Sequence, residues 1–170
     1  MAEKSTVRAI PEGYGTVTPW IVVRGAADMI DYLKEAFGAV ELGRVNNPNG
    51  KIGHAEVRIG DSVVMLFDAR DDWPETPSFN RLYVEDAEAV FQQAVKAGGT
   101  VVTEITTLGF GDRVGRVRDP KGNLWWIQQH IEDLTPEEMG KRATDPKYSE
   151  AMQRVQNSLD REMRGRKGNV

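Results

Sequence analysis

The spacing of apolar and polar residues changes several times along the chain, and each change predicts a different element. Residues 16–24 are rich in β-branched and aromatic side chains, which favours a strand. From Ala26 to Phe37 the apolar residues recur every three or four positions, which predicts a helix that Gly38 ends. Apolar or alternating runs then predict strands at 40–45, 52–59 and 62–67. The predicted order is therefore β-α-β-β-β.

The same pattern begins again after a polar loop at 69–77. It predicts a strand at 78–84 and a helix at 86–96, followed by strands at 101–105, 113–118 and 124–127. The two halves agree in register at a separation of 61 residues, with one extra residue in the second hairpin turn. This agreement indicates an internal duplication. The matching positions include Val23 and Val84, Ala26 and Ala87, Gly38 and Gly99, and Val40 and Val101.

The last predicted hairpin, at 111–130, has the clearest turn in the chain. Asp119-Pro120-Lys121-Gly122-Asn123 joins an alternating run to the aromatic run that starts at Leu124. Proline fixes φ and glycine accepts the positive φ that a tight reversal needs. By register, this hairpin is the second copy of residues 52–68.

A third segment follows at 131–170. Thr135 is a candidate N-cap, Pro136 suits the first helical position, and acidic residues occupy the first turn, while 147–163 can form a second helix. Eight acidic and eight basic residues balance in this segment. We interpret it as a C-terminal helical arm that is solvated or packs on a partner, or alternatively closes over the cleft of a partner subunit. The predicted organisation is a lead-in at 1–15, a domain at 16–130 with modules at 16–68 and 78–130, and the arm.

Composition narrows the possible functions. The formal net charge of the 170 residues is −4, without the basic excess expected of a nucleic-acid-binding protein. The absence of cysteine excludes disulfides, thiolate metal sites and cysteine nucleophiles. The N-terminus lacks the apolar core of a signal peptide, and no apolar run approaches membrane-spanning length. We therefore expect a soluble, cytoplasmic protein that binds neither nucleic acid nor membrane.

Two tandem β-α-β-β-β units with a DPxGN turn before the last strand resemble the vicinal oxygen chelate superfamily. This superfamily includes glyoxalase I, extradiol dioxygenases, fosfomycin-resistance enzymes and bleomycin-binding proteins. KIGHAEVRIGDSVVMLFD and GFGDRVGRVRDPKGNLWWIQQHIEDLTPEEM look like its PhnB-like subgroup. The resemblance implies an α+β fold in which two modules form a curved mixed sheet, with helices on the convex side and a C-terminal helical extension. It also implies a ligand cleft on the concave side and a homodimer.

The resemblance also provides a test for metal binding. Metal-dependent members carry His, Gln or Glu near the start of the first strand of each module and Glu in the middle of its last strand. Those positions correspond here to Thr18, Phe79, Met65 and Trp126. None of these side chains is a credible ligand for a divalent ion. We therefore expect no metal and no cofactor.

Strand alternation, combined with the resemblance, identifies the residues that would face the cleft. A cleft lined by aromatic rings with a few polar groups is typical of a small-molecule site. The loop residue Phe110 would lie at its rim. The predicted ligand-binding residues are Trp20, Arg58, Phe79, Tyr83, Phe110, Arg116, Trp126 and Gln128.

His54 and Glu56 are the candidate catalytic residues. They lie two positions apart on one predicted strand and so share a face. Histidine titrates near neutral pH, and Glu56 could orient it or act as the base. Two alternatives remain open at this stage. His54 and Glu56 could recognise a ligand, or they could belong with Arg58, Arg116 and Arg118 to a cross-strand ladder of charges.

Three hypotheses about function follow. The first is a metal-independent protein of the bleomycin-resistance type, which sequesters a partly aromatic or cationic compound. The second is an enzyme, an isomerase, lyase, cyclase or dioxygenase, that uses His54 and Glu56 or an unrecognised metal site. The third is a non-catalytic module that interacts with other proteins through its C-terminal arm.

Overall fold

The computed structural model describes residues 7–166, so the outer ends of the predicted lead-in and arm lie outside the described residues. The chain divides into two compact units. Unit 1 comprises the residues up to Lys34 together with Gly38–Thr76, and unit 2 comprises Glu35–Phe37 together with the residues from Pro77 onward. Each unit contains one four-stranded sheet.

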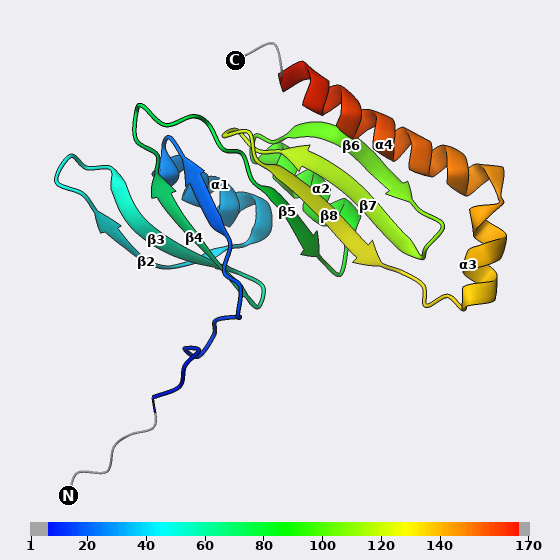
Figure 1. Ribbon diagram of the computed structural model, residues 1–170, viewed down its shortest axis with the longest axis horizontal. Coiled ribbons are helices and arrows are strands. Elements are labelled where there is room, and N and C mark those ends of the chain that lie inside the picture. Colours follow the sequence, from blue (N-terminus) through cyan, green and yellow to red (C-terminus); the bar gives the residue numbers. More distant parts are fainter. Residues whose placement is uncertain (1–6, 167–170) are drawn as a thin grey trace, which may run out of the picture. The chain divides into compact units, whose positions relative to one another are not determined.

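Unit 1 has the predicted β-α-β-β-β order (Figure 1). Its strands are arranged β1-β4-β3-β2, with β1 parallel to β4 and the other neighbours antiparallel. Its elements are β1 (Trp20–Val23), α1 (Ala26–Phe37), β2 (Val40–Asn46), β3 (Ile52–Ile59) and β4 (Ser62–Asp68), the last turn of α1 being assigned to unit 2.

One face of this sheet lies in the core, as the alternation predicts. Along β3, Ala55 and Val57 are fully buried, whereas the intervening Glu56 is only partly buried. Ile21 of β1 and Leu66 of β4 are also fully buried. The residues with the opposite alternation therefore form the second face of the sheet.

Unit 2 repeats this topology and adds two helices (Figure 1). Its strands are arranged β5-β8-β7-β6, again with the first strand parallel to the last. Its elements are β5 (Phe79–Tyr83), α2 (Ala87–Lys96), β6 (Thr100–Thr107), β7 (Asp112–Arg118), β8 (Leu124–His130), α3 (Pro136–Ala143) and α4 (Pro146–Arg166).

The register of the two sheets confirms the duplication. Trp20 lies opposite Met65 in unit 1, and the residues 61 positions later, Arg81 and Trp126, lie opposite each other in unit 2. On the other side of the same strands, Glu56 pairs with Met65 as Arg116 pairs with Trp126. Glu56 and Arg116 therefore occupy equivalent positions.

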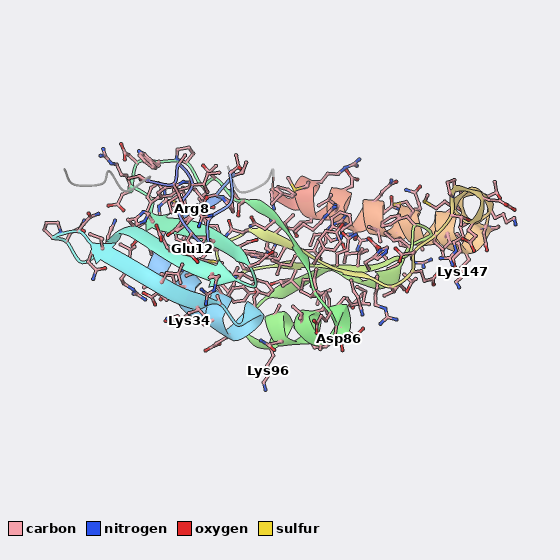
Figure 2. All side chains as sticks on the ribbon, turned by 90° about the horizontal axis from the view of Figure 1, so that it is seen from below. Arg8, Glu12, Lys34, Asp86, Lys96 and Lys147 are labelled. Carbon is pink, nitrogen blue, oxygen red and sulfur yellow. The ribbon has the colours of Figure 1, made fainter. Side chains whose placement is uncertain are left out.

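Local chemistry sets the helix ends. The side chain of Asp86 accepts a hydrogen bond from the backbone N–H of Ala89 at the start of α2, and Lys96 lies in the last turn, so both charges suit the helix dipole. Figure 2 shows these two residues at opposite ends of α2. Thr135 caps α3 in a capping box with Glu138, which confirms the predicted N-cap.

The DPKGN turn is organised by a buried carboxylate. Asp119 is only 2% exposed and accepts hydrogen bonds from the backbone N–H groups of Lys121 and Asn123. It also accepts one from the indole Nε1 of Trp125 at 2.8 Å. Gly122 has φ 91°, a conformation that favours glycine. This carboxylate therefore fixes both the turn and the first part of β8.

Helices cover both faces of the unit 2 sheet. On one face α2 packs so closely that a Cβ at Gly115 would contact the Phe91 ring. On the other face Ala151 and Val155 of α4 are buried against Leu108 and Val114. Figure 1 shows α4, coloured orange to red, running along β6.

The position of α4 differs from the arm that we expected from the sequence. Only Ala151 and Val155 of this helix are buried, and its mean hydropathy is low, so its sequence offers few apolar residues for packing on a sheet. Polar contacts with the sheet, described below, supplement this narrow apolar stripe. The helix therefore packs on its own sheet, although its sequence is typical of a solvated helix.

No helix within residues 7–166 is both long enough and apolar enough to cross a membrane.

Candidate functional site

The face of the unit 1 sheet opposite its core carries the predicted catalytic pair. Trp20 of β1, Glu56 of β3 and Met65 of β4 lie side by side in the strand register. His54 precedes Glu56 by two residues and points to the same side. Trp20 is 47% exposed, so no other described part of the chain covers this face completely.

Aromatic rings gather on this face. The centroid of the Trp20 ring lies 5.5 Å from that of His54 and 5.4 Å from that of Phe67, both with edge-to-face geometry. The ring centroid of Phe67 also lies 6.1 Å from that of Trp73, which comes from the loop after β4. We call Trp20, His54, Phe67 and Trp73 the aromatic cluster. Because Trp20 and Trp73 are exposed in part, the cluster has free aromatic surface.

Glu56 provides a negative charge beside the aromatic cluster. Its carboxylate accepts a hydrogen bond from the Tyr14 hydroxyl, and its Oε1 lies 3.0 Å from the Nε2 of His54. The hydrogen bond from Tyr14 and then that from His54 lower the pKa of Glu56, and the same carboxylate raises the pKa of Tyr14. Glu56 is therefore ionised at neutral pH.

The structure brings His54 and Glu56 together, as the i, i+2 spacing predicts. The lowered pKa makes Glu56 a weaker base, but its position at the imidazole suits a group that orients His54. Arg58 is exposed near the end of the same strand. Sequence reasoning missed Tyr14 and Phe67, because neither lies in a pattern that points to Glu56 or to a ring cluster.

The equivalent face of unit 2 carries two arginine side chains and is covered by α4. Arg116 is 4% exposed, and its Nη1 donates to the carbonyl oxygen of Val155 on α4 at 2.7 Å and to the Oγ1 of Thr103 at 3.1 Å. Its guanidinium carbon lies 3.9 Å from the centroid of the Trp126 ring, and that of Arg81 lies 4.8 Å from it. Burial and then the charge of Arg81 lower the pKa of Arg116 to about 10.

Further polar contacts hold α4 on this face. Arg118 pairs with Glu162 at 3.1 Å, and the hydroxyls of Thr103 and Ser158 lie 2.7 Å apart. The predicted ladder of five charges is therefore divided, because His54 and Glu56 pair in unit 1 whereas Arg116 and Arg118 bind α4 in unit 2. Of the predicted ligand-binding residues in unit 2, Arg116 and Trp126 lie beneath α4.

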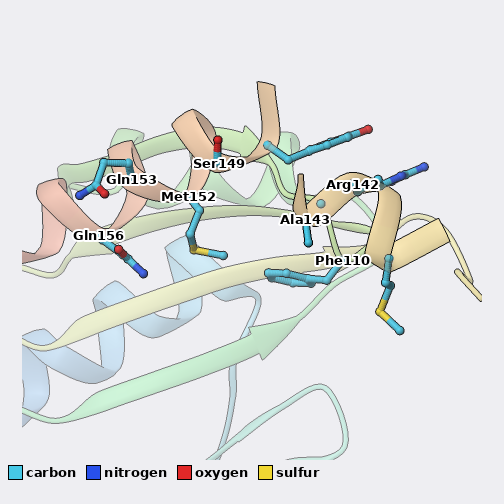
Figure 3. Close-up of a pocket in the computed structure, with 10 residues that line it drawn as sticks. Phe110, Arg142, Ala143, Ser149, Met152, Gln153 and Gln156 are labelled. Atoms are coloured by element: carbon cyan, nitrogen blue, oxygen red, sulfur yellow. The ribbon is translucent and has the colours of Figure 1, made fainter. Parts of the chain in front are cut away.

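The other predicted residues of unit 2 lie in three different places. Phe79 and Tyr83, on the edge strand β5, are 59% and 64% exposed. Gln128 is buried, and its amide donates to the carboxylate of Asp112. Phe110 lines a pocket formed with α3 and α4 (Figure 3).

A second histidine cluster lies at the ends of β7 and β8, and sequence reasoning missed it. The Nδ1 of His130 lies 2.6 Å from Asp112, and its Nε2 lies 2.9 Å from Asp133. The hydrogen bonds to Asp133 and then to Asp112 raise the pKa of His130. The two carboxylates bind opposite sides of the ring, which suits a charged structural clamp. Asp112 is opposite His130 in the register, and this pairing is the sequence signal that could have found it.

The residues at the superfamily's metal positions do not fit a metal ion. Met65 lies between Trp20 and Glu56 in the register, and Trp126 has a guanidinium over its ring, which would repel a cation. In the part of the chain from 7 to 166, no three His, Cys, Asp or Glu side chains form a group that could hold a metal ion.

Comparison with known proteins agrees with this fold. Residues 14–127 match the Glyoxalase/Bleomycin resistance protein/Dioxygenase superfamily. The uncharacterized protein Mb0911c of Mycobacterium bovis is 40% identical over 137 residues, which are 72% of this chain and 88% of that protein.

Solved structures that are similar in fold include two whose names are informative. The fosfomycin resistance protein FosX from Listeria monocytogenes is 14% identical with a TM-score of 0.57, and the match covers 74% of this chain and 97% of FosX. The PhnB protein from Bacillus cereus is 15% identical with a TM-score of 0.53, and the match covers 68% of this chain and 99% of that one. At these identities the likeness shows the fold alone. Together with the sequence match, the tandem modules establish that the chain belongs to the glyoxalase/bleomycin resistance protein/dioxygenase superfamily, as its sequence predicts.

Proposed function

We propose that this protein is a metal-independent small-molecule binding protein that holds a partly aromatic, cationic ligand against the open face of unit 1. One observation carries the proposal: Trp20, Phe67 and Trp73 form a continuous, partly exposed aromatic surface beside the ionised carboxylate of Glu56. The ligand would stack on the rings and place its positive charge near Glu56.

The chemistry of this face favours a cation over a neutral or anionic ligand. A cation over an indole ring gains about 0.5–2 kcal/mol, depending on how far the pair is desolvated. Arg70 lies over the Trp73 ring, 5.7 Å from its centroid, so a ring of this face already takes part in a cation–π contact, which supports the proposal. Glu56 receives hydrogen bonds from Tyr14 and His54, so its orientation is fixed before a ligand arrives.

The biological role that we propose is sequestration of a toxic compound. The superfamily description includes bleomycin resistance proteins, and FosX, which shares the fold, is a fosfomycin resistance protein. A binding protein confers resistance by holding its ligand without changing it, for which an aromatic face with no metal is sufficient. We propose that it acts in the cytoplasm as a homodimer.

The proposal can be tested with three probes that share one ring system: naphthylmethylammonium, naphthalenemethanol and naphthoate. The labelled methyl group of Met65 is the reporter, because Met65 lies opposite both Trp20 and Glu56. We expect the cation to shift the Met65 methyl resonance at lower concentration than the alcohol or the anion does.

Glu56→Gln should weaken cation binding about tenfold or less, as expected for the loss of one exposed charge interaction. Glu104→Gln is the matched control, because it removes an exposed carboxylate from β6 in unit 2. Equal binding of all three probes, or an equal effect of the two variants, would contradict the role of Glu56.

A second candidate function is metal-free acid/base catalysis. It is favoured by the 3.0 Å contact between the Nε2 of His54 and the Oε1 of Glu56, which holds the imidazole beside the Trp20 ring. An enzyme of this kind would convert its ligand, and in His54→Gln its turnover would fall much further than its ligand affinity. A bound compound recovered chemically unchanged after prolonged incubation supports the binding protein instead.

A further inference from the structure

We propose that the pocket between α3, α4 and the β6–β7 loop is a second ligand site, which takes an uncharged aromatic compound. Its volume is about 370 Å³. Binding pockets for small molecules start at roughly 300 Å³. All of its lining residues except Gly109 and Phe110 come from the C-terminal helices, beyond the residues 14–127 that match the superfamily. The site is therefore separate from the open face of unit 1.

The interior of the pocket suits an aromatic ring. In Figure 3, Phe110 lies below α3 and α4, and the side chains of Ala143 and Met152 point towards it. Met139 also contributes to the lining. Thioether sulfur atoms make favourable contacts with aromatic rings, and flexible methionines adapt to ligands of different shape. Phe110 and Met139 are 39% and 42% exposed, so a bound ring would bury apolar surface that is now in water.

The charged groups around the pocket favour an uncharged ligand. Arg142 is the one charged residue among the lining residues that the structure describes. It already pairs with Glu132, its guanidinium carbon lies 5.1 Å from the centroid of the Tyr148 ring, and Figure 3 shows its side chain directed away from Phe110. A cation inside the pocket would lose hydration without gaining a counter-ion, and an anion would have to compete with Glu132 for Arg142, so both charges are unfavourable there. Gln153 and Gln156 supply polar groups for a hydroxyl or a carbonyl.

The loop that carries Phe110 is held in place by close contacts. A Cβ at Gly109 would lie 3.1 Å from the Cβ of Tyr148, so the loop meets α4 without a gap. Gly111 has φ 91°, and a Cβ there would collide with the carbonyl oxygen of Glu132. The backbone N–H groups of Ile131 and Glu132 both donate to the carbonyl oxygen of Gly111. The Phe110 side of the pocket is therefore preformed, which reduces the entropy lost on binding.

The test uses the full chain, the same three naphthyl probes and labelled methionine methyl groups. Naphthalenemethanol should shift the resonances of Met139 and Met152 at concentrations that leave Met65 unchanged. Naphthoate and naphthylmethylammonium should need at least about tenfold higher concentrations to produce the same shifts, because each must bring an uncompensated charge into the pocket.

Two variants of one helix identify the pocket as the site. Ala143→Leu fills the space below α3 and should abolish the shift at Met152. Gly140→Leu is the matched control, because a Cβ at Gly140 meets nothing within 4 Å, and its binding should equal that of the wild type. Unchanged binding in Ala143→Leu would overturn the proposal, as would equal affinity for the neutral and charged probes.

This experiment tests the two proposed sites independently of each other. A neutral probe that shifts Met139 and Met152 supports the pocket even if no cation reaches Met65. A cation that shifts Met65, with no effect of any probe at Met139 or Met152, supports the open face and overturns the pocket.

Discussion

Glu56 and Arg116 occupy equivalent positions in the two sheets, yet their charges and surroundings are opposite. Glu56 accepts hydrogen bonds beside an open aromatic surface, whereas Arg116 is buried and donates to the backbone of α4. One duplicated position has therefore diverged into a partly exposed anion and a buried cation. Because the anion is the more accessible of the two, this pair supports the proposed preference for a cationic ligand.

A pH-dependent stability is predicted at His130. Its pKa in the folded protein is raised by Asp133 and Asp112, so its stabilising contribution is complete below the unfolded pKa of about 6.5 and is lost as the pH rises through the folded value. His130→Gln should therefore lower the free energy of unfolding at about pH 5.5 and change it much less at about pH 9. Urea unfolding at both pH values measures this, and an equal loss at the two would contradict the charged clamp.

The sequence predicted the pair of His54 and Glu56 because strand alternation has a period of two and needs no tertiary information. It did not predict that Tyr14 binds Glu56, since that contact joins a segment before the first strand to the third strand. The exposure of Trp20 and the covering of Trp126 by α4 could not be predicted either. Alternation assigns both to the same kind of face and does not show which face a later helix covers.

The elements themselves were predictable where local chemistry marks their ends. Helix α1 and strand β3 have the predicted bounds, because Gly38 ends the helix and the alternation in β3 is regular. The first strand starts later than predicted, at Trp20, since Pro19 has no N–H to donate to a neighbouring strand. Strand β8 continues to His130, because polar residues in its second half pair with β7.

Val155 anchors α4 to the unit 2 sheet. It is 1% exposed among Leu108, Val114 and Ala151, so Val155→Ala should cost about 2 kcal/mol in the free energy of unfolding from lost burial and the cavity left behind. It should also shift Trp126 emission to longer wavelength as water reaches the ring. Denaturant unfolding and fluorescence measure these effects.

Arg154→Ala is the control for this variant, because Arg154 is exposed on the same helix. Exposed substitutions of this kind usually change stability by less than about 0.5 kcal/mol. Similar effects of the two variants would show that the packing of α4 on the sheet does not depend on its buried residues.

A truncation that removes α4 and leaves oligomeric state and partner binding unchanged would contradict the hypothesis of an interaction arm.

At the scale of the whole molecule, the edge strand β2 suits an interface with a second copy of the chain. Val40, Leu42 and Val45 are 49%, 43% and 63% exposed on a strand with a free edge. Exposed apolar side chains on an edge strand favour association. Leu42→Glu should therefore lower the sedimentation coefficient from that of a dimer to that of a monomer. Val101→Glu, on the equivalent edge strand β6 of unit 2, is the control, and dissociation in both variants or in neither would contradict an interface through β2.

We propose that the open face of unit 1 binds an aromatic cation without a metal. The most direct measurement is calorimetric titration of the wild type and of Trp20→Ala with naphthylmethylammonium, after dialysis against a chelator. We predict saturable binding by the chelator-treated wild type and, because one stacking ring is lost, at least about tenfold weaker binding by Trp20→Ala. Binding that needs added metal, or equal affinity in the two proteins, would contradict metal-independent binding at this face.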